Sequence, residues 1–160
     1  MTEIIVRVAD LRVGGAGDVI VTIGLGSCVA IVLYDAVARV GGMAHVLLPS
    51  PMLARGTGNP ARFPQTAVPA LLAEMTAAGA SPARTTARLA GGASMFASLA
   101  APGTIQMGER NIVAARQALS AARLPIVGEA VGGNFGRTVR LHVADGRIDV
   151  TSVLHGSLAL

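Results

Sequence analysis

The sequence contains no lysine, and arginine supplies all 13 of its basic side chains. The absence of lysine excludes a Schiff-base mechanism and a P-loop phosphate site, because both depend on an ammonium group. Aromatic residues make up only 2% of the chain, which leaves no stacking platform for single-stranded nucleic acid. The arginines are scattered rather than clustered. Despite the net charge of +4, we therefore expect solvated surface charges and no binding of nucleic acid.

Cysteine is almost absent too, since Cys28 is the single one in the chain. One cysteine allows no intramolecular disulfide, which fits a reducing compartment. The first ten residues include three charged side chains and do not resemble a signal peptide. The charge-free run between Asp18 and Asp35 is too short and too rich in glycine to cross a membrane. We expect a cytoplasmic protein that does not insert into a membrane.

What the chain has in abundance is small and branched apolar residues, and hydrophobic residues make up 52% of it. Its 160 residues suit one domain with a sizeable core. Apolar periodicity predicts helices from Pro64 to Gly79 and from Glu109 to Ala122. We expect about eight strands, a glycine-rich connection over Leu11–Gly17 and a loosely held tail from about residue 154. The fold class predicted for residues 1–160 is a single layered α+β domain. The expected strands are Glu3–Val8, Asp18–Ile23, Cys28–Tyr34, Val40–Leu48, Thr85–Ala90, Ile126–Val131, Arg137–Val143 and Arg147–Val153.

A hairpin in the first third of the chain contains the residues of greatest chemical interest. Two β-rich runs, Cys28–Tyr34 and Val40–Leu48, flank a turn-like Asp35–Arg39, which predicts a hairpin with a loop of about five residues. Pairing the strands across this loop makes paired positions add up to about 74, so Cys28 falls opposite position 46 or 45. With a slight bulge, the thiol of Cys28 and the imidazole of His45 would lie side by side on one face.

A thiol beside an imidazole is the arrangement of a nucleophile and its base. His45 lies in an otherwise apolar run, where a buried imidazole needs a polar partner. Thr22, at the end of the preceding strand, is a candidate to orient that ring, although its position also fits an ordinary β-branched strand residue. Gly26 and Ser27, with the backbone N–H groups around the sulfur, are candidates to support an oxyanion.

A metal site is the alternative use of these side chains. Cys28, His45 and His142 could in principle hold zinc, but no metal-ligand spacing supports such a site. His142 is expected to face solvent, and His155 lies in the tail. We expect neither a metal nor a cofactor.

The run GLGSCVAIVLYDAVARVGGMAHVLLP resembles the signature of CheD, the chemoreceptor glutamine deamidase family of bacterial chemotaxis. The resemblance continues in the same order through three further blocks and covers nearly the whole chain from about residue 18 to 150. These blocks are GGASMF (Gly91–Phe96), MGERN (Met107–Asn111) and VGGNFGRTVRLHV (Val131–Val143).

This resemblance implies an enzyme, a protein-glutamine glutaminase that converts glutamines of methyl-accepting chemoreceptors to glutamates. The family's cysteine, histidine and threonine fall on Cys28, His45 and Thr22. The implied fold is the three-layer α/β/β sandwich shared with the cytotoxic-necrotizing-factor toxins, and the implied second partner is a CheC-type phosphatase. One departure is Phe63, where many relatives have tyrosine.

The residues alone leave two other readings open. A cysteine peptidase or another amidohydrolase would use the same Cys–His pair. A non-catalytic regulator would bind receptors or the CheC partner and keep Cys28 only as a packing residue. A pure binder would not need Cys28, His45 and Thr22 together, which favours an enzyme.

Overall fold

The computed structural model describes residues 2–51, 58–96, 99 and 101–160. The described residues form ten strands and two α-helices, α1 (Pro64–Ala77) and α2 (Met107–Ala121). The strands are β1 (Thr2–Ile5), β2 (Leu11–Gly14), β3 (Asp18–Leu25), β4 (Val29–Asp35), β5 (Val40–Val46), β6 (Thr85–Gly91), β7 (Ile126–Val131), β8 (Arg137–His142), β9 (Arg147–Ser152) and β10 (Gly156–Ala159).

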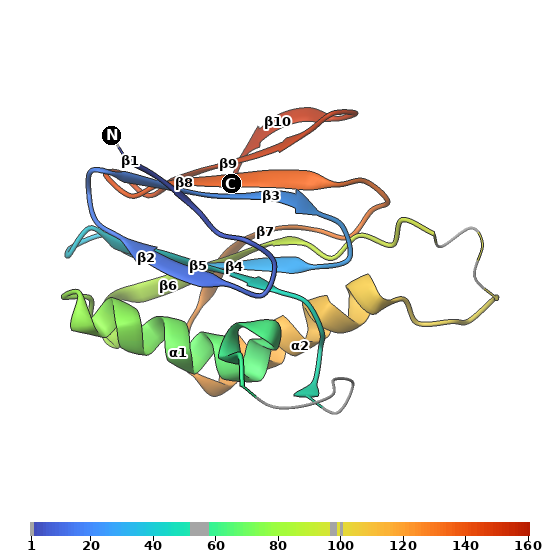
Figure 1. Ribbon diagram of the computed structural model, residues 1–160, viewed down its shortest axis with the longest axis horizontal. Helices are drawn as coiled ribbons and strands as arrows, with labels where there is room; N and C mark the ends of the chain where they lie inside the picture. Colours follow the sequence, from blue (N-terminus) through green and yellow to red (C-terminus); the bar gives the residue numbers. More distant parts are fainter. Residues whose placement is uncertain (1, 52–57, 97–98, 100) are drawn as a thin grey trace.

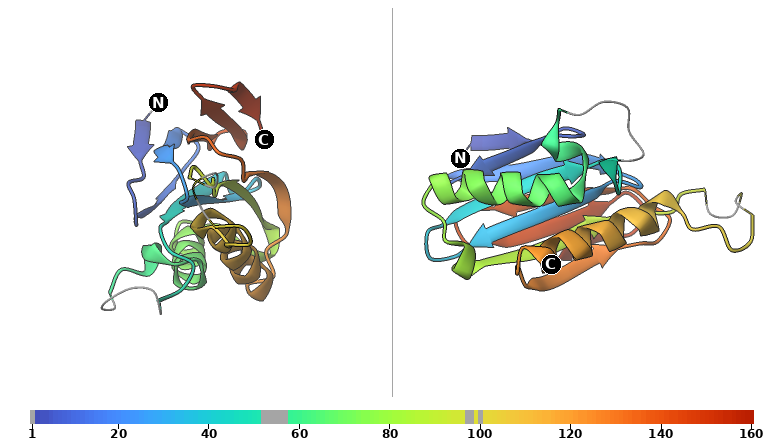
Figure 2. Two further views of the ribbon diagram at one scale, coloured as in Figure 1. Left: turned by 90° about the vertical axis from the view of Figure 1, so that its right-hand side faces the viewer. Right: turned by 90° about the horizontal axis from the view of Figure 1, so that it is seen from below.

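The strands form two five-stranded sheets stacked face to face (Figure 1). One sheet has the order β2-β5-β4-β6-β7, and the other has the order β1-β3-β8-β9-β10. Both helices lie side by side on the outer face of the first sheet, as Figure 2 shows from below. The layers are therefore helices, then the β4–β5 sheet, then the β3–β8 sheet, which makes a mixed α+β domain.

Two apolar cores follow from these three layers. The first core fills the space between the helices and the β4–β5 sheet, with Leu33, Leu71 and Leu119 among its members. The second core lies between the two sheets and includes Ile20 and Leu141. Every residue of β4 and of β5 is buried, because these strands form the middle of the central layer and both of their faces are covered.

Both predicted helices are confirmed to within two residues at each end. Pro64 occupies the first helical position of α1, where its missing N–H costs nothing. Phe63 is buried at the N-cap of this helix, with the guanidinium of Arg62 5.5 Å from the centre of its ring. The described helices include none that is long and apolar enough to cross a membrane.

Two sequence-based expectations at the edges of the sheets are wrong. The predicted connection over Leu11–Gly17 contains β2, an edge strand that pairs with β5. The tail that we expected to be loosely held from about residue 154 forms β10, which pairs antiparallel with β9. All four residues of β10 have exposed side chains, so no apolar alternation marks this strand in the sequence; backbone pairing holds it.

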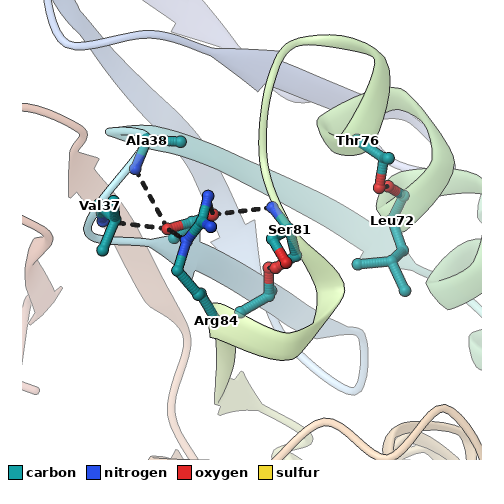
Figure 3. Close-up of polar contacts among 8 residues, drawn as sticks. Val37, Ala38, Leu72, Thr76, Ser81 and Arg84 are labelled. Atoms are coloured by element: carbon teal, nitrogen blue, oxygen red, sulfur yellow. Dashed lines mark hydrogen bonds and ion pairs between the residues drawn. The ribbon is translucent and has the colours of Figure 1, made fainter.

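The turn of the central hairpin is fixed by one buried carboxylate, Asp35. It accepts hydrogen bonds from the backbone N–H groups of Val37, Ala38 and Ser81 and from Nε of Arg84, at 2.8–3.2 Å (Figure 3). Burial by itself would raise the pKa of Asp35, but these bonds outweigh it and hold the pKa at about 2. Asp35 therefore ties the hairpin turn to the segment that leads into β6.

Candidate active site

The open end of the β4–β5 hairpin contains Cys28 and His45. The register pairs Ala30 with His45 and Val29 with Val46, so paired positions add up to 75 rather than 74 and no bulge occurs. In this register Cys28 would fall opposite Leu47, two positions beyond His45. Our expectation that the thiol and the imidazole lie directly side by side across the two strands is therefore wrong. Cys28 comes two residues before Ala30 and packs, like Ala30, against the core between the sheets. The thiol thus lies diagonally from His45 on the same face, a spacing that long side chains span.

The imidazole of His45 reaches across to the other sheet and contacts Thr22 of β3. Its Nδ1 lies 2.7 Å from the Thr22 hydroxyl, and that hydroxyl lies 2.7 Å from the carbonyl oxygen of Val6. A carbonyl only accepts, so the single hydroxyl proton of Thr22 points to Val6. Nδ1 of His45 must then carry a proton and donate it to the Thr22 oxygen. This hydrogen-bond chain places the lone pair of a neutral His45 on Nε2.

Nε2 of His45 is buried and has no hydrogen-bond partner among the described residues. Burial lowers the pKa of His45 below its ordinary value of 6.5, so the ring is neutral at neutral pH. Burial also raises the pKa of the Cys28 thiol, partly opposed by a hydrogen bond from the residue's own backbone N–H. The resting pair is therefore a neutral thiol and a neutral imidazole. An unpartnered buried lone pair is costly in a fold and is what a general base requires.

The backbone around Cys28 is held by a glycine-rich segment that follows β6. The Cys28 carbonyl accepts a hydrogen bond of 2.8 Å from the N–H of Gly92, and the Gly26 carbonyl accepts one of 2.9 Å from Ala93. Gly91 has a φ of +106°, and a Cβ there would run into the Cys28 carbonyl oxygen. Glycine is thus required beside Cys28, which gives the GGASMF block a structural role.

Sequence reasoning did not assign a role to Asn111, although the residue lies in the MGERN block. Its side chain is fully buried on α2. Its Nδ2 donates to the carbonyl of Ser27 at 2.8 Å and to that of Leu47 at 3.3 Å. These two carbonyls flank the site, one just before Cys28 and the other two residues after His45. The signal was available as a polar residue on the apolar face of an amphipathic helix.

Two cavities open beside the site. One of about 280 Å³ has Ser27 in its wall and is otherwise formed by residues 93–96 and 106–108. The other, of about 570 Å³, lies between the β3 end and the β8–β9 hairpin and includes Arg137. Met95 lines both cavities and is half exposed. Met95 therefore separates the two cavities.

The remaining histidines lie away from this site. Nε2 of His142 contacts the Asp149 carboxylate at 2.9 Å in the outer sheet. The ring of His155 packs at a tilt against Phe135, with 4.1 Å between the ring centres and 41° between the ring planes. Across the described residues, histidine, cysteine and acidic side chains form no group of three or more that could hold a metal ion.

Comparisons with a family model and with curated proteins both point to one family. A family model described as CheD chemotactic sensory transduction matches residues 47–152, more than half of the chain. The chain belongs to this family. The match begins beyond Cys28 and His45, so it does not test the roles expected of those residues.

Curated relatives cover more of the chain. A probable chemoreceptor glutamine deamidase CheD of Caldanaerobacter subterraneus subsp. tengcongensis is 42% identical over 151 residues, which is 94% of this chain and 93% of the relative. The protein with the same description in Desulforamulus reducens is 38% identical and covers 94% of this chain and 91% of the relative.

One solved structure has a similar fold, the Neisseria meningitidis protein NMB0706, of the family DUF152. It superposes with a TM-score of 0.56 at 11% identity. The match covers 84% of this chain and 65% of that chain. At this identity the likeness concerns the fold alone.

Proposed function

We propose that this CheD-family protein deamidates glutamine side chains of methyl-accepting chemoreceptors to glutamate, with Cys28 as the nucleophile. The observation that carries the chemistry is the buried, unpartnered Nε2 of His45, whose tautomer the Thr22–Val6 chain fixes. The substrate comes from the curated relatives, each described as a probable chemoreceptor glutamine deamidase.

In the first half of the reaction, Nε2 of His45 accepts the thiol proton as the Cys28 sulfur attacks the carboxamide carbon. Substrate binding is needed to bring sulfur and Nε2 together, because catalytic contacts often tighten only in the complex. The carbonyl π-bond electrons move to the oxygen, and backbone N–H groups at Gly26, Ser27 and Cys28 are candidates to stabilise that oxyanion. The imidazolium then protonates the nitrogen, the C–N bond breaks, and ammonia leaves behind a glutamyl thioester.

In the second half of the reaction, water hydrolyses the glutamyl thioester. Nε2 of His45 removes a proton from water, the resulting hydroxide attacks the thioester carbon, and the C–S bond breaks with return of the proton to sulfur. Throughout, the Thr22 hydroxyl accepts from Nδ1 and keeps the ring in place, although it carries no charge to stabilise the imidazolium.

The wider assignments form part of the same proposal. Residues 1–160 act as one cytoplasmic deamidase domain, with the sandwich fold of the cytotoxic-necrotizing-factor toxins and a CheC-type phosphatase as a regulatory partner. The apolar side chains around the site suit a protein substrate rather than a small amide. Ile23, Met95, Phe96 and Leu154 are all at least 49% exposed and lie in the walls of the two cavities.

The test is co-expression with a soluble cytoplasmic fragment of a chemoreceptor, followed by mass spectrometry of its peptides. Each converted glutamine adds roughly one dalton to its peptide, since an NH₂ group is exchanged for OH. We expect conversion with the native protein and none with Cys28→Ala. Cleaved backbone bonds in place of converted side chains would instead support a peptidase. Stable binding to the fragment with no mass change would support the non-catalytic regulator.

A further inference from the structure

The ladder between β4 and β5 stops one step short of the nucleophile. Its last pair at the open end is Val29 with Val46, and continuing the same register would pair Cys28 with Leu47. Just beyond this last pair, the side-chain amide of Asn111 on α2 bridges the two strands. It donates hydrogen bonds to the carbonyls of Ser27 and Leu47. The two ends that contain the nucleophile and the base are therefore tied together through a helix side chain.

The chemistry of its neighbours fixes the orientation of this side chain. Both partners of Asn111 are carbonyl oxygens, which only accept hydrogen bonds, so the NH₂ group must face them. In the flipped amide, Oδ1 of Asn111 would face these two carbonyl oxygens and no donor would lie between them. In this orientation Oδ1 of Asn111 is buried and has no hydrogen-bond partner among the described residues. A buried acceptor left unpaired opposes folding, so the two hydrogen bonds that Nδ2 donates are made against an energetic cost.

Holding the Ser27 carbonyl also sets the direction of the Cys28 N–H. The two groups belong to one peptide plane, and in a trans peptide they point in opposite directions; the described residues include no cis peptide bond. Because the carbonyl points toward Asn111, the N–H points in the opposite direction, away from that side chain. The same N–H partly opposes the rise that burial causes in the pKa of the Cys28 thiol, as an N–H close to the sulfur does.

We infer that Asn111 is a positioning residue that fixes the Ser27–Cys28 peptide so that the Cys28 N–H is preorganised to receive the oxyanion. This inference rests on the proposed thioester chemistry and adds to it a residue that touches neither substrate nor reacting atoms. Preorganised donors act without the cost of reorientation during the reaction. Without Asn111 the Ser27 carbonyl loses its hydrogen-bond donor, and this peptide is held only through the neighbouring Gly26 and Cys28 carbonyls. The direction of the donor is then less well fixed while the thiol remains.

The experiment compares two reactions of Cys28 that differ in whether an oxyanion forms. Acylation by p-nitrophenyl acetate passes through a tetrahedral oxyanion, whereas alkylation by iodoacetamide is a displacement at carbon and forms none. Both are followed by intact-protein mass spectrometry for the native protein, Asn111→Ala, His45→Ala and the control Leu119→Val. Leu119 is buried on the same helix in the helix-facing core, so its variant reports a loss of packing away from the site.

For Asn111→Ala we expect acylation slowed by about 10²-fold, the usual effect of losing one oxyanion donor, and alkylation within about threefold of the native rate. His45→Ala should slow both reactions, because thiolate formation loses its base, and Leu119→Val should slow neither. Equal slowing of both reactions in Asn111→Ala would overturn the inference, since it would show displacement of Cys28 itself. An unchanged acylation rate would overturn it as well.

Asn111→Ser serves as the second variant if Asn111→Ala does not fold. Its short hydroxyl cannot bridge both carbonyls, so we expect the same selective loss of acylation. Because both reagents are independent of the receptor, these rates test Asn111 even if the receptor fragment is not a substrate. A native protein that is acylated normally but leaves the fragment unchanged would contradict the proposed function and not this inference.

Discussion

The two ends of the β4–β5 hairpin use buried polar groups in opposite ways. At the turn end, the Asp35 carboxylate receives four hydrogen bonds and an ion pair with Arg84 at 3.0 Å. At the open end, Nε2 of His45 and Oδ1 of Asn111 are buried and unpartnered among the described residues. One end is satisfied and stabilises the fold, and the other is left unsatisfied. The comparison indicates that the hairpin is anchored at its turn so that its open end can keep a reactive lone pair.

The largest effect on turnover is expected from Cys28. Cys28→Ala and Cys28→Ser should abolish deamidation, because alanine has no nucleophile and a serine hydroxyl is far harder to ionise than a thiol. Both variants should melt within a few degrees of the native protein, since Cys28 is small and only partly buried at the edge of the core between the sheets. Turnover is measured by mass spectrometry of the receptor fragment, with circular dichroism as the folding control. Near-normal activity of Cys28→Ala would refute the mechanism.

The next largest effect is expected from His45. His45→Ala should lower kcat/KM by about 10²–10⁴-fold, as is usual for loss of a general acid–base residue, and should slow alkylation of Cys28. An unchanged alkylation rate would mean that the two side chains do not communicate.

The pH dependence of the native protein should report the same residue. Since burial lowers the pKa of His45 below 6.5, the acid limb of kcat/KM should lie below that value and disappear from the residual activity of His45→Ala. The folded state binds this proton less readily than the unfolded state, so stability should also fall as the pH drops below 6.5. A melting curve at each pH separates the two effects. An acid limb above pH 6.5 would contradict the assignment.

A smaller effect is expected from Thr22, which contacts His45 and takes no direct part in the proposed reaction. Thr22→Val deletes the hydroxyl and keeps the β-branched shape, so we expect kcat to fall about tenfold and the free energy of unfolding to change by about 1 kcal/mol, the scale of one hydrogen bond. Thr22→Ser keeps the hydroxyl and should retain much of the activity. Both variants are assayed on one receptor fragment. Full activity of Thr22→Val would show that Thr22 has no role in the reaction and that only Cys28 and His45 act in it.

The smallest effect on turnover is expected at the turn end. Asp35→Asn should lower the free energy of unfolding by about 3 kcal/mol, because it removes a buried partner of Arg84 and of three backbone N–H groups. Activity per folded molecule should stay near the native value. Asp145→Asn is the matched control, since Asp145 is an exposed turn aspartate that accepts one hydrogen bond from Arg147.

The stabilisation by Asp35 should also depend on acidity in a defined range. Its pKa falls from 3.8 to about 2 on folding, so its contribution is present above pH 3.8 and is lost as the pH drops toward 2. Denaturant titrations at several pH values should show this loss in the native protein and not in Asp35→Asn. A large fall in the turnover of folded Asp35→Asn would contradict the view that the turn end serves stability and the open end serves the reaction.

Local patterns in the sequence predicted most of the elements. The 3.6-residue apolar period located α1 and α2, and the expected strand Ile126–Val131 is β7. The register of the central hairpin was missed by one position because Asp35 belongs to β4 and pairs with Val40. Its carboxylate is satisfied by Ser81 and Arg84, far away in sequence, so the hairpin residues alone gave no reason to place it in the strand.

By itself the sequence determined which side chains are available for chemistry: a lone thiol after small residues, a histidine in an apolar run and a threonine on the preceding strand. The tertiary structure decided how they are arranged and which atoms they contact. The contact of His45 with Thr22 forms only because the two sheets stack, and the chain from Thr22 to Val6 then selects the tautomer. Asn111 meets Ser27 across 84 residues because α2 packs on the central sheet. Such contacts follow from the packing of layers, which no short-range periodicity encodes.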